Sequence, residues 1–245
     1  MRDWLTNAVL DSSAYLPEGA EGYVLGRGLP FSLMEEMKVG LWTPPEPPSP
    51  DTTFSYRHGD RGSRVHGWLT LPLWSPRGRV LGVEYRRWDG EKEVTKFFLP
   101  DAAWCPAFIG LTPSALNRIW EGGDVWLVEG VFDLALAHAV PSEDTVLGCG
   151  GAKLTRSHLA FLQRFMRPNA MVHVAFDMDE TGQKMATGYI HPDTGRRVWG
   201  VVERLTHAGL RAHRVEYRGG KDPGEVWERG GTSALRRAFS LGGPT

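Results

Sequence analysis

The stretch VHVAFDMDETG, residues 172–182, joins an apolar run to a sudden group of acidic side chains. Its first five residues are apolar except for His173, which is the pattern of a strand buried on both faces of a parallel sheet. Asp177 and Asp179 follow where this strand is expected to end. Open α/β sheets place their chemistry at the carboxyl ends of their strands, so this one stretch predicts both a fold class and the position of a site.

Two other segments carry an acidic residue to the same kind of position. The run VWLVEGVFD (125–133) places Glu129 after an apolar strand, and YRGGKDPGEVW (217–227) places Asp222 after an extended one. Because the carboxyl ends of parallel strands meet at one edge of a sheet, we expect all these carboxylates to converge there. A carboxylate cluster without matching cysteines or histidines suits Mg²⁺ or Mn²⁺ and is typical of phosphate chemistry.

The chain after residue 112 alternates between strand and helix patterns. Thr155 is a candidate N-cap, and Gly209 is expected to end the last helix of the series. The order β-α-β-α-β-α-β predicts a parallel sheet with right-handed crossovers. The expected strands cover 124–129, 145–149, 171–176 and 211–217, and the expected helices cover 133–140, 154–166 and 198–210.

The chain up to residue 112 has a different, β-rich pattern. Strands are expected at 65–74, 79–88 and 93–99, joined by turn-forming residues, after short helices that reach Leu10 and cover 32–40. The proline-dense segment 43–51 is expected to be extended and exposed. The predicted fold class is therefore α/β, or α+β overall. A mixed β-rich subdomain (1–112) precedes a parallel-sheet α/β subdomain with a short C-terminal tail (113–245).

Composition limits the partners and the compartment. The 245 residues carry a formal net charge of −1, so binding to nucleic acid would need a local basic patch. Cys105 and Cys149 are too few for a four-cysteine zinc site or a disulfide framework, so we expect a reduced, cytoplasmic protein without zinc. No run of about 18 apolar residues occurs, and no membrane contact is expected.

Two templates explain only part of the acidic pattern. A calcium-binding EF-hand loop starting at Asp177 would need a bidentate glutamate at residue 188, which is glycine. A haloacid-dehalogenase-type phosphatase would use Asp177 as the nucleophile and Asp179 as the acid/base. That template needs further loops downstream for which little chain remains, and it leaves Glu129 unexplained. The plainest alternative is that the two aspartates only cap a helix.

A third template accounts for all the acidic segments together. In order and spacing they resemble the TOPRIM domain shared by DnaG-type primases, topoisomerases and some nucleases. An upstream segment, SAYLPEGAEGYVLGRGLP, resembles the opening of the RNA-polymerase domain of the same primases, and the strands that follow resemble its basic stretch. The segments that carry the TOPRIM resemblance are VEGVFD (128–133), GCGGAKLTRSHLAFL (148–162), AFDMDETGQKMA (175–186) and GGKDPGEVW (219–227).

The resemblance assigns roles to individual residues. It implies metal binding by Asp177, Asp179 and Asp222, with Glu129 as a general base or a further ligand. Glycines at 130, 150 and 151 would let the chain pass close to the acids. Basic side chains would hold the template strand or nucleotide phosphates, although neighbouring strand residues point to opposite faces of a sheet. These candidates are Arg86, Arg87, Lys96 and Lys153.

The implied function is that of a DnaG-like primase core with its active groove between the two subdomains. It would be a DNA-directed RNA polymerase that makes short RNA primers on single-stranded DNA by metal-dependent nucleotidyl transfer, using ribonucleoside triphosphates and two or more Mg²⁺ or Mn²⁺ ions. Because no zinc ribbon or helicase-binding domain is recognised, a phage or mobile-element protein working with a separate replicative helicase or zinc-bearing protein is expected. A TOPRIM nuclease, the phosphatase and a non-catalytic single-strand-binding module remain the alternatives. A topoisomerase is disfavoured, because the chain lacks room for strand-gate domains.

Overall fold

One mixed sheet runs through the molecule and joins its two halves. The computed structural model describes residues 2–43, 65–91, 93–98 and 108–240, so most of the proline-dense segment and Cys105 lie outside the described residues. The elements before residue 112 are α1 (Arg2–Ser12), α2 (Glu18–Gly26), α3 (Phe31–Met37), β1 (Gly40–Leu41), β2 (Leu69–Trp74), β3 (Val80–Arg86), β4 (Val94–Phe98) and β5 (Phe108–Ile109).

The second half supplies the parallel strands and the helices that connect them. Its elements are α5 (Pro113–Glu121), β6 (Val125–Val128), η2 (Phe132–His138), β7 (Thr145–Gly148), α6 (Arg156–Phe165), β8 (Met171–Val174), α7 (Glu180–Thr187), β9 (Tyr189–Ile190), β10 (Arg197–Val198), α8 (Val201–His207), β11 (Arg211–Arg214) and α9 (Pro223–Ser240).

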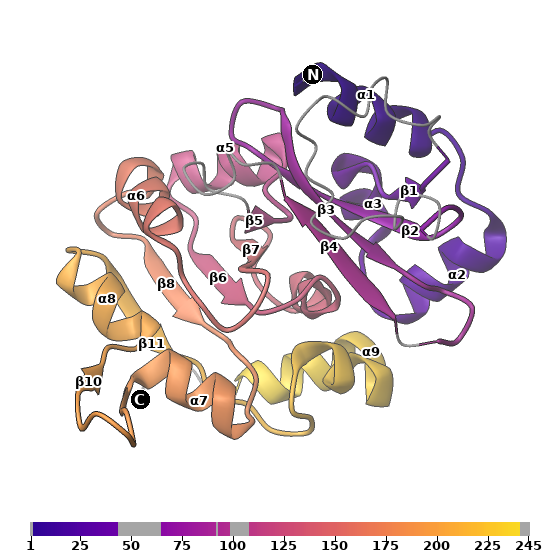
Figure 1. Ribbon diagram of the computed structural model, residues 1–245. Coiled ribbons are helices and arrows are strands. Elements are labelled where there is room, and N and C mark those ends of the chain that lie inside the picture. Colours follow the sequence, from indigo (N-terminus) through magenta and orange to yellow (C-terminus); the bar gives the residue numbers. More distant parts are fainter. Residues whose placement is uncertain (1, 44–64, 92, 99–107, 241–245) are drawn as a thin grey trace.

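Nine of the described strands form one sheet in the order β11-β8-β6-β7-β5-β2-β3-β4, with β1 paired to β2 (Figure 1). Strands β11, β8, β6 and β7 are parallel, whereas β5, β2, β3 and β4 pair antiparallel. The pair between Ile109 of β5 and Gly148 of β7 joins the two parts. The predicted α/β class, with a β-rich first part and a parallel second part, is therefore confirmed, and the sheet crosses the proposed boundary at residue 112.

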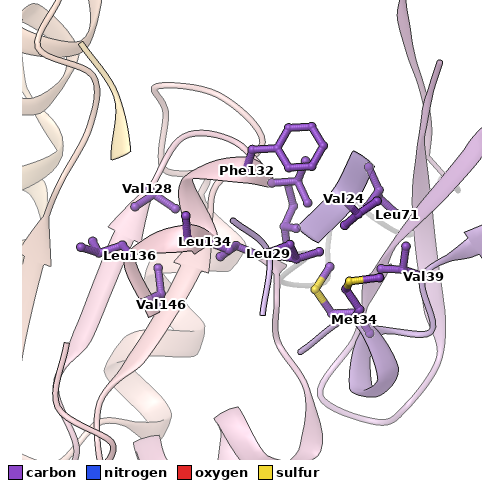
Figure 2. Packing of buried hydrophobic residues seen from close by; sticks show 14 of the residues in the cluster. Val24, Leu29, Met34, Val39, Leu71, Val128, Phe132, Leu134, Leu136 and Val146 are labelled. Carbon is purple, nitrogen blue, oxygen red and sulfur yellow. The ribbon is translucent and has the colours of Figure 1, made fainter. Parts of the chain in front are cut away.

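A shared core packs both halves together. Leu29 and Leu71 from the first half lie in the same buried cluster as Phe132, Leu134 and Val146 from the second (Figure 2). The apolar runs of β6 and β8 explain this arrangement, because a strand inside a parallel sheet must bury both of its faces. The other face of these strands is covered by α5, α6, α7 and α8, and α1 packs in a third cluster on β3.

Several segments differ from the sequence-based expectation, and α5, α7 and the strands β9 and β10 had no expected counterpart. The stretch expected as an α-helix over 133–140 is the 3₁₀ helix η2, because this buried segment is held by packing against α9 instead of by helix propensity. Helix α2 was not expected. The expected C-terminal tail contains α9, which is interrupted at Gly230 and at Gly231 (φ 58°). The expected caps at Thr155 and Gly209 are consistent with the structure, since Thr155 caps α6 and α8 ends before Gly209.

The small hairpin β9–β10 lies between α7 and α8 and is separate from the main sheet. Its two ends lie close together. Gly188 and Gly200 lie in backbone contact, because a Cβ added to Gly200 would lie 2.3 Å from the nitrogen of Gly188. Side chains at the tip and base are exposed, including Ile190 and Trp199. The hairpin is thus an excursion whose two ends meet.

Within the described part of the chain, no helix has the length and apolar character needed to cross a membrane.

Candidate active site

The predicted acidic residues lie in the segments that follow three neighbouring parallel strands. Glu129 follows β6 and Asp177 follows β8, while Asp222 lies in the segment between β11 and α9. Strand β8 lies between β6 and β11 in the sheet, so its loop passes between the other two. The convergence expected from the sequence is present, because the amide N–H of Asp177 donates to Oε1 of Glu129 at 3.1 Å.

The carboxylates of Glu129, Asp179 and Asp222 are each oriented by one oxygen that accepts a backbone N–H. Oδ1 of Asp179 accepts from Gly182 at 2.8 Å, and Oδ1 of Asp222 accepts from Glu225 at 2.7 Å. Asp179 is thus the N-cap of α7. The capping alternative and the metal-binding prediction are compatible, because a carboxylate has a second oxygen for another partner.

Gly182 allows α7 to lie against Glu129. A Cβ at this position would lie 2.2 Å from the carbonyl oxygen of Asp177 and 2.9 Å from Oε1 of Glu129. Only glycine therefore fits, because backbone cannot yield at such distances. The sequence carries this signal as the glycine three residues after Asp179.

Burial and the charges of neighbouring carboxylates raise the pKa values of these acids. Burial raises the pKa of Asp177 to about 8, with further contributions from Asp133, Glu129, Asp222 and Asp179. Burial raises the pKa of Asp133 to about 6, and the charge of Asp222 adds to the rise. Burial and the charge of Asp179 also raise the pKa of Glu129. In such a group, burial and like charge disfavour the ionised carboxylates unless they bind protons or cations.

The donor set suits a hard divalent cation. Oδ1 of Asp177 is buried and has no hydrogen-bond partner, which is costly unless a ligand satisfies it. Carboxylate oxygens are the ligands that Mg²⁺ and Mn²⁺ prefer. Among the residues that the structure describes, however, no group of three or more His, Cys, Asp or Glu side chains is arranged to hold a metal as it stands. Metal binding would therefore need the free oxygens to reorient.

Asp133 was not among the predicted site residues. Its side chain is 8% exposed, and its Oδ2 accepts the N–H of Gly130 at 2.7 Å. This bond fixes the turn in which Glu129 and Gly130 follow β6. The signal was present in the sequence, as the acidic residue that closes VEGVFD.

The predicted basic residues divide into two groups. Arg86 donates from Nη2 to Oε1 of Glu84 at 2.9 Å, and Lys96 lies 3.1 Å from the other oxygen of the same carboxylate. Glu84 is only 2% exposed, so a buried anion holds these two cations together. Arg87 instead pairs with Asp89 and other acids of the β3–β4 turn.

Lys96 links the basic strands to the acidic edge. Its Nζ lies 3.5 Å from the carbonyl oxygen of Gly150. The N–H of Gly151 in turn donates to the carbonyl of Glu129 at 2.9 Å. The φ angles of 75° at Gly150 and 136° at Gly151 are accessible to glycine, which is why the loop can take this path. Lys153, just beyond it, is exposed.

A second arginine lies beside Arg86. The guanidinium of Arg27 lies 4.8 Å from the ring centroid of Phe132, and that of Arg86 lies 4.7 Å from the same centroid. Arg27 also pairs with Glu228 of α9. Arg27 lies in the segment GRGLP. The sequence gives no sign that Arg27 and Arg86 contact the same ring, that of Phe132, which precedes Asp133.

Comparison with known proteins agrees with this geometry. Residues 126–227 match the family model described as Toprim-like. This segment is similar to the Toprim-like family and is called the Toprim-like domain below. The Toprim-like domain contains Glu129, Asp177, Asp179 and Asp222, and its parallel strands β6, β8 and β11 carry them. The resemblance seen in the sequence is thereby confirmed for this part of the chain.

A curated relative extends the likeness beyond the Toprim-like domain. A DNA primase of Aquifex aeolicus (strain VF5) is 28% identical over 178 residues, which cover 71% of this chain and 32% of the relative. The chain thus spans about a third of the length of that primase.

Solved structures show the same fold around the Toprim-like domain. The crystal structure of the zinc-binding and RNA polymerase domains of the Aquifex aeolicus primase matches with a TM-score of 0.64 and 22% identity, covering 99% of this chain and 62% of that one. A DnaG primase catalytic domain bound to single-stranded DNA matches with a TM-score of 0.57 and 17% identity, covering 97% and 77%. The chain therefore has the fold of DnaG-type catalytic cores.

Proposed function

We propose that this protein is a DnaG-like primase core, which makes short RNA primers on a single-stranded DNA template by metal-dependent nucleotidyl transfer. The observation that carries the proposal is the convergence of Glu129, Asp177 and Asp222 at one sheet edge, with a buried and unpartnered oxygen on Asp177. The relationship to a DNA primase and the shared fold support the same reaction.

The acidic side chains would hold Mg²⁺ or Mn²⁺. Asp177, Asp179 and Asp222 are the proposed ligands, each through an oxygen not used by the backbone. When bound, the metal would favour the alkoxide of the attacking 3′-hydroxyl and neutralise charge on the leaving pyrophosphate. Glu129 is the proposed proton acceptor, because its raised pKa makes it a stronger base than an ordinary carboxylate.

The basic side chains would hold the polyanions. Arg86 and Lys96 are fixed by Glu84, and Lys96 reaches the glycine loop beside Glu129. We propose that they and Arg27 bind template or triphosphate oxygens, with Lys153 at the exposed rim of the same loop. Arg87 contributes less in this proposal, because acids of its own turn already neutralise it.

The partners follow from the same proposal. The related catalytic domain was solved with single-stranded DNA, and the related Aquifex aeolicus structure contains zinc-binding domains. We propose single-stranded DNA and ribonucleoside triphosphates as substrates, with a replicative helicase or a zinc-bearing protein as a separate partner.

The test is primer synthesis by the purified chain. Single-stranded DNA of mixed sequence, Mg²⁺ or Mn²⁺ and labelled ribonucleotides should give short template-dependent products. Asp177→Asn should abolish them, whereas Asp193→Asn, at an exposed carboxylate of the β9–β10 hairpin, should leave them unchanged. Shortened DNA without added nucleotides would identify a nuclease instead, and synthesis retained by Asp177→Asn would overturn the proposed site.

A further inference from the structure

A backbone hydrogen bond ties together the two acidic loops of the candidate site. The N–H of Met178 donates to the carbonyl oxygen of Lys221 at 2.6 Å. Met178 lies between Asp177 and Asp179, and Lys221 immediately precedes Asp222. The spacing between the aspartate pair and Asp222 therefore depends on how this one bond is held.

The side chain of Tyr217 holds the carbonyl group that accepts this hydrogen bond. Its hydroxyl donates to the same carbonyl of Lys221 at 3.0 Å and lies 3.4 Å from the carbonyl oxygen of Phe176. The side chain is 4% exposed, and its ring stacks on Phe239 of α9 with the centroids 4.6 Å apart. A hydroxyl on a ring held in this way presents its proton at a fixed place, so it orients the carbonyl that Met178 needs.

Arg214, the last residue of β11, holds the other loop. Its Nη2 donates to the carbonyl of Asp177 at 2.9 Å, and its Nη1 donates to the carbonyl of Val174 at 3.3 Å. These partners are neutral, so the positive charge of Arg214 still acts on the acids, and it offsets part of the rise in the pKa of Glu129. The guanidinium thus fixes the loop after β8 through backbone carbonyls, and these hydrogen bonds use no carboxylate oxygen.

We infer that Tyr217 and Arg214 are a positioning pair, which sets the separation of Asp177 and Asp222 and thereby the affinity of the site for a divalent cation. Both side chains act on backbone carbonyls, so they work through the acids and not on a substrate. The inference rests on the proposed function in so far as the acids bind metal. It adds two residues to the acids themselves: Arg214 ends β11, and Tyr217 lies three residues after it.

The first test is the affinity for Mn²⁺, measured from the electron paramagnetic resonance signal of the free ion with the full chain and no nucleic acid. Tyr217→Phe and Arg214→Lys should each raise the Kd by about tenfold, as is typical when groups that orient metal ligands are lost. Arg211→Lys is the matched control, because Arg211 lies on the same strand and donates to the carbonyl of Asn169 at 2.8 Å, among the residues before β8. Its Kd should equal that of the wild type.

A second test does not need metal. Hydrogen exchange of the Met178 amide, followed by mass spectrometry in EDTA, should be about tenfold faster in Tyr217→Phe than in the wild type, because the acceptor carbonyl is no longer fixed. If the chain makes primers, excess Mn²⁺ should restore synthesis by Tyr217→Phe. A general folding defect would instead speed hydrogen exchange throughout the chain.

The outcomes separate the two proposals. If the wild type binds Mn²⁺ and Tyr217→Phe and Arg214→Lys match it within about twofold, the positioning pair is overturned and the metal site stands. If the wild type binds no Mn²⁺, the metal site and the positioning pair both fall. If Mn²⁺ binding behaves as expected but no primers are made, the positioning pair stands and the primase proposal fails.

Discussion

The carboxylate of Asp179 serves the fold and still has an oxygen available for the proposed chemistry. Its Oδ1 caps α7 by accepting the N–H of Gly182, while the other oxygen remains for a ligand. A substitution that keeps the cap and removes the charge can separate these two roles, because asparagine is as good an N-cap as aspartate.

We expect Asp179→Asn to keep the melting temperature of the wild type and to lose primer synthesis. Asp179→Ala should lose synthesis and also about 1 kcal/mol of unfolding free energy, because the cap is gone. Thermal melts in EDTA and a primer-synthesis assay check both variants. Activity retained by Asp179→Asn would mean that this residue serves only as a cap.

Asp177 predicts a pH dependence of stability in the absence of metal. Its pKa is raised from 3.8 to about 8 in the folded chain, so folding favours the protonated form. The stabilisation from this group is complete below about pH 4 and is lost as the pH rises towards 8. In EDTA the free energy of unfolding should therefore fall across this range.

Asp177→Asn should flatten this dependence and stabilise the metal-free chain at pH 8 by about 2 kcal/mol, a value reduced for the partial exposure of the site. Urea titrations at several pH values in EDTA measure the effect. Wild-type and variant curves with the same pH slope would show that the acids do not repel one another as described.

At the scale of elements, the position of α9 depends on a turn far away in the sequence. Trp227 of α9 donates from Nε1 to the carbonyl of Gly26 at 3.2 Å and stacks on His138 of η2. Gly28 lies beneath it with a φ of 85°, and a Cβ there would lie 2.6 Å from Cγ of Trp227. The turn after α2 thus sets where α9 begins, next to Asp222.

Gly28→Ala should destabilise the chain by about 2–4 kcal/mol, because it adds a steric clash to the cost of the left-handed backbone. Gly67→Ala is the control, since Gly67 has a φ of 77° and open space around its Cα hydrogen, and it should cost only about 1–2 kcal/mol. Chemical denaturation compares them. Equal losses would mean that α9 shifts freely and that its contact with the turn is not specific.

The elements also show what the sequence could and could not reveal. Strands β6 and β8 were predicted because their apolar runs reflect burial on both faces, and the capping residue Thr155 marked the start of α6. Neither α2 nor α9 was predicted, because their positions depend on contacts such as Trp227 with Gly26 that join distant segments. The acids of the site were found from their place after strands. Arg214 and Tyr217 were not, because their partners are backbone carbonyls that leave no pattern in sequence.

For the whole molecule, the shared core predicts cooperative unfolding. Leu71 of β2 and Leu134 of η2 are both fully buried and belong to the same cluster, although they come from different halves of the chain (Figure 2). The sheet also continues between the halves through β5 and β7. Each half also has a buried cluster largely of its own, but the shared cluster and the continuous sheet couple them, so we expect them to unfold together.

Leu71→Ala and Leu134→Ala should each lower the free energy of unfolding by about 2–5 kcal/mol, through lost burial and the cavity left behind. Each should shift one common transition, followed by tryptophan fluorescence and by circular dichroism in the same urea series. Two separate transitions, with each variant moving only one of them, would show that the halves unfold independently.

The meeting of Gly188 and Gly200 has a consequence for how the chain can vary. Because the hairpin between them begins and ends at one point, its length is decoupled from the geometry of α7 and α8. Related chains can lengthen, shorten or replace this excursion without moving the aspartates, and an experimenter can do the same. A fluorescent reporter or an affinity handle inserted at its tip would move with the second half of the molecule while leaving its sheet and its acidic edge undisturbed.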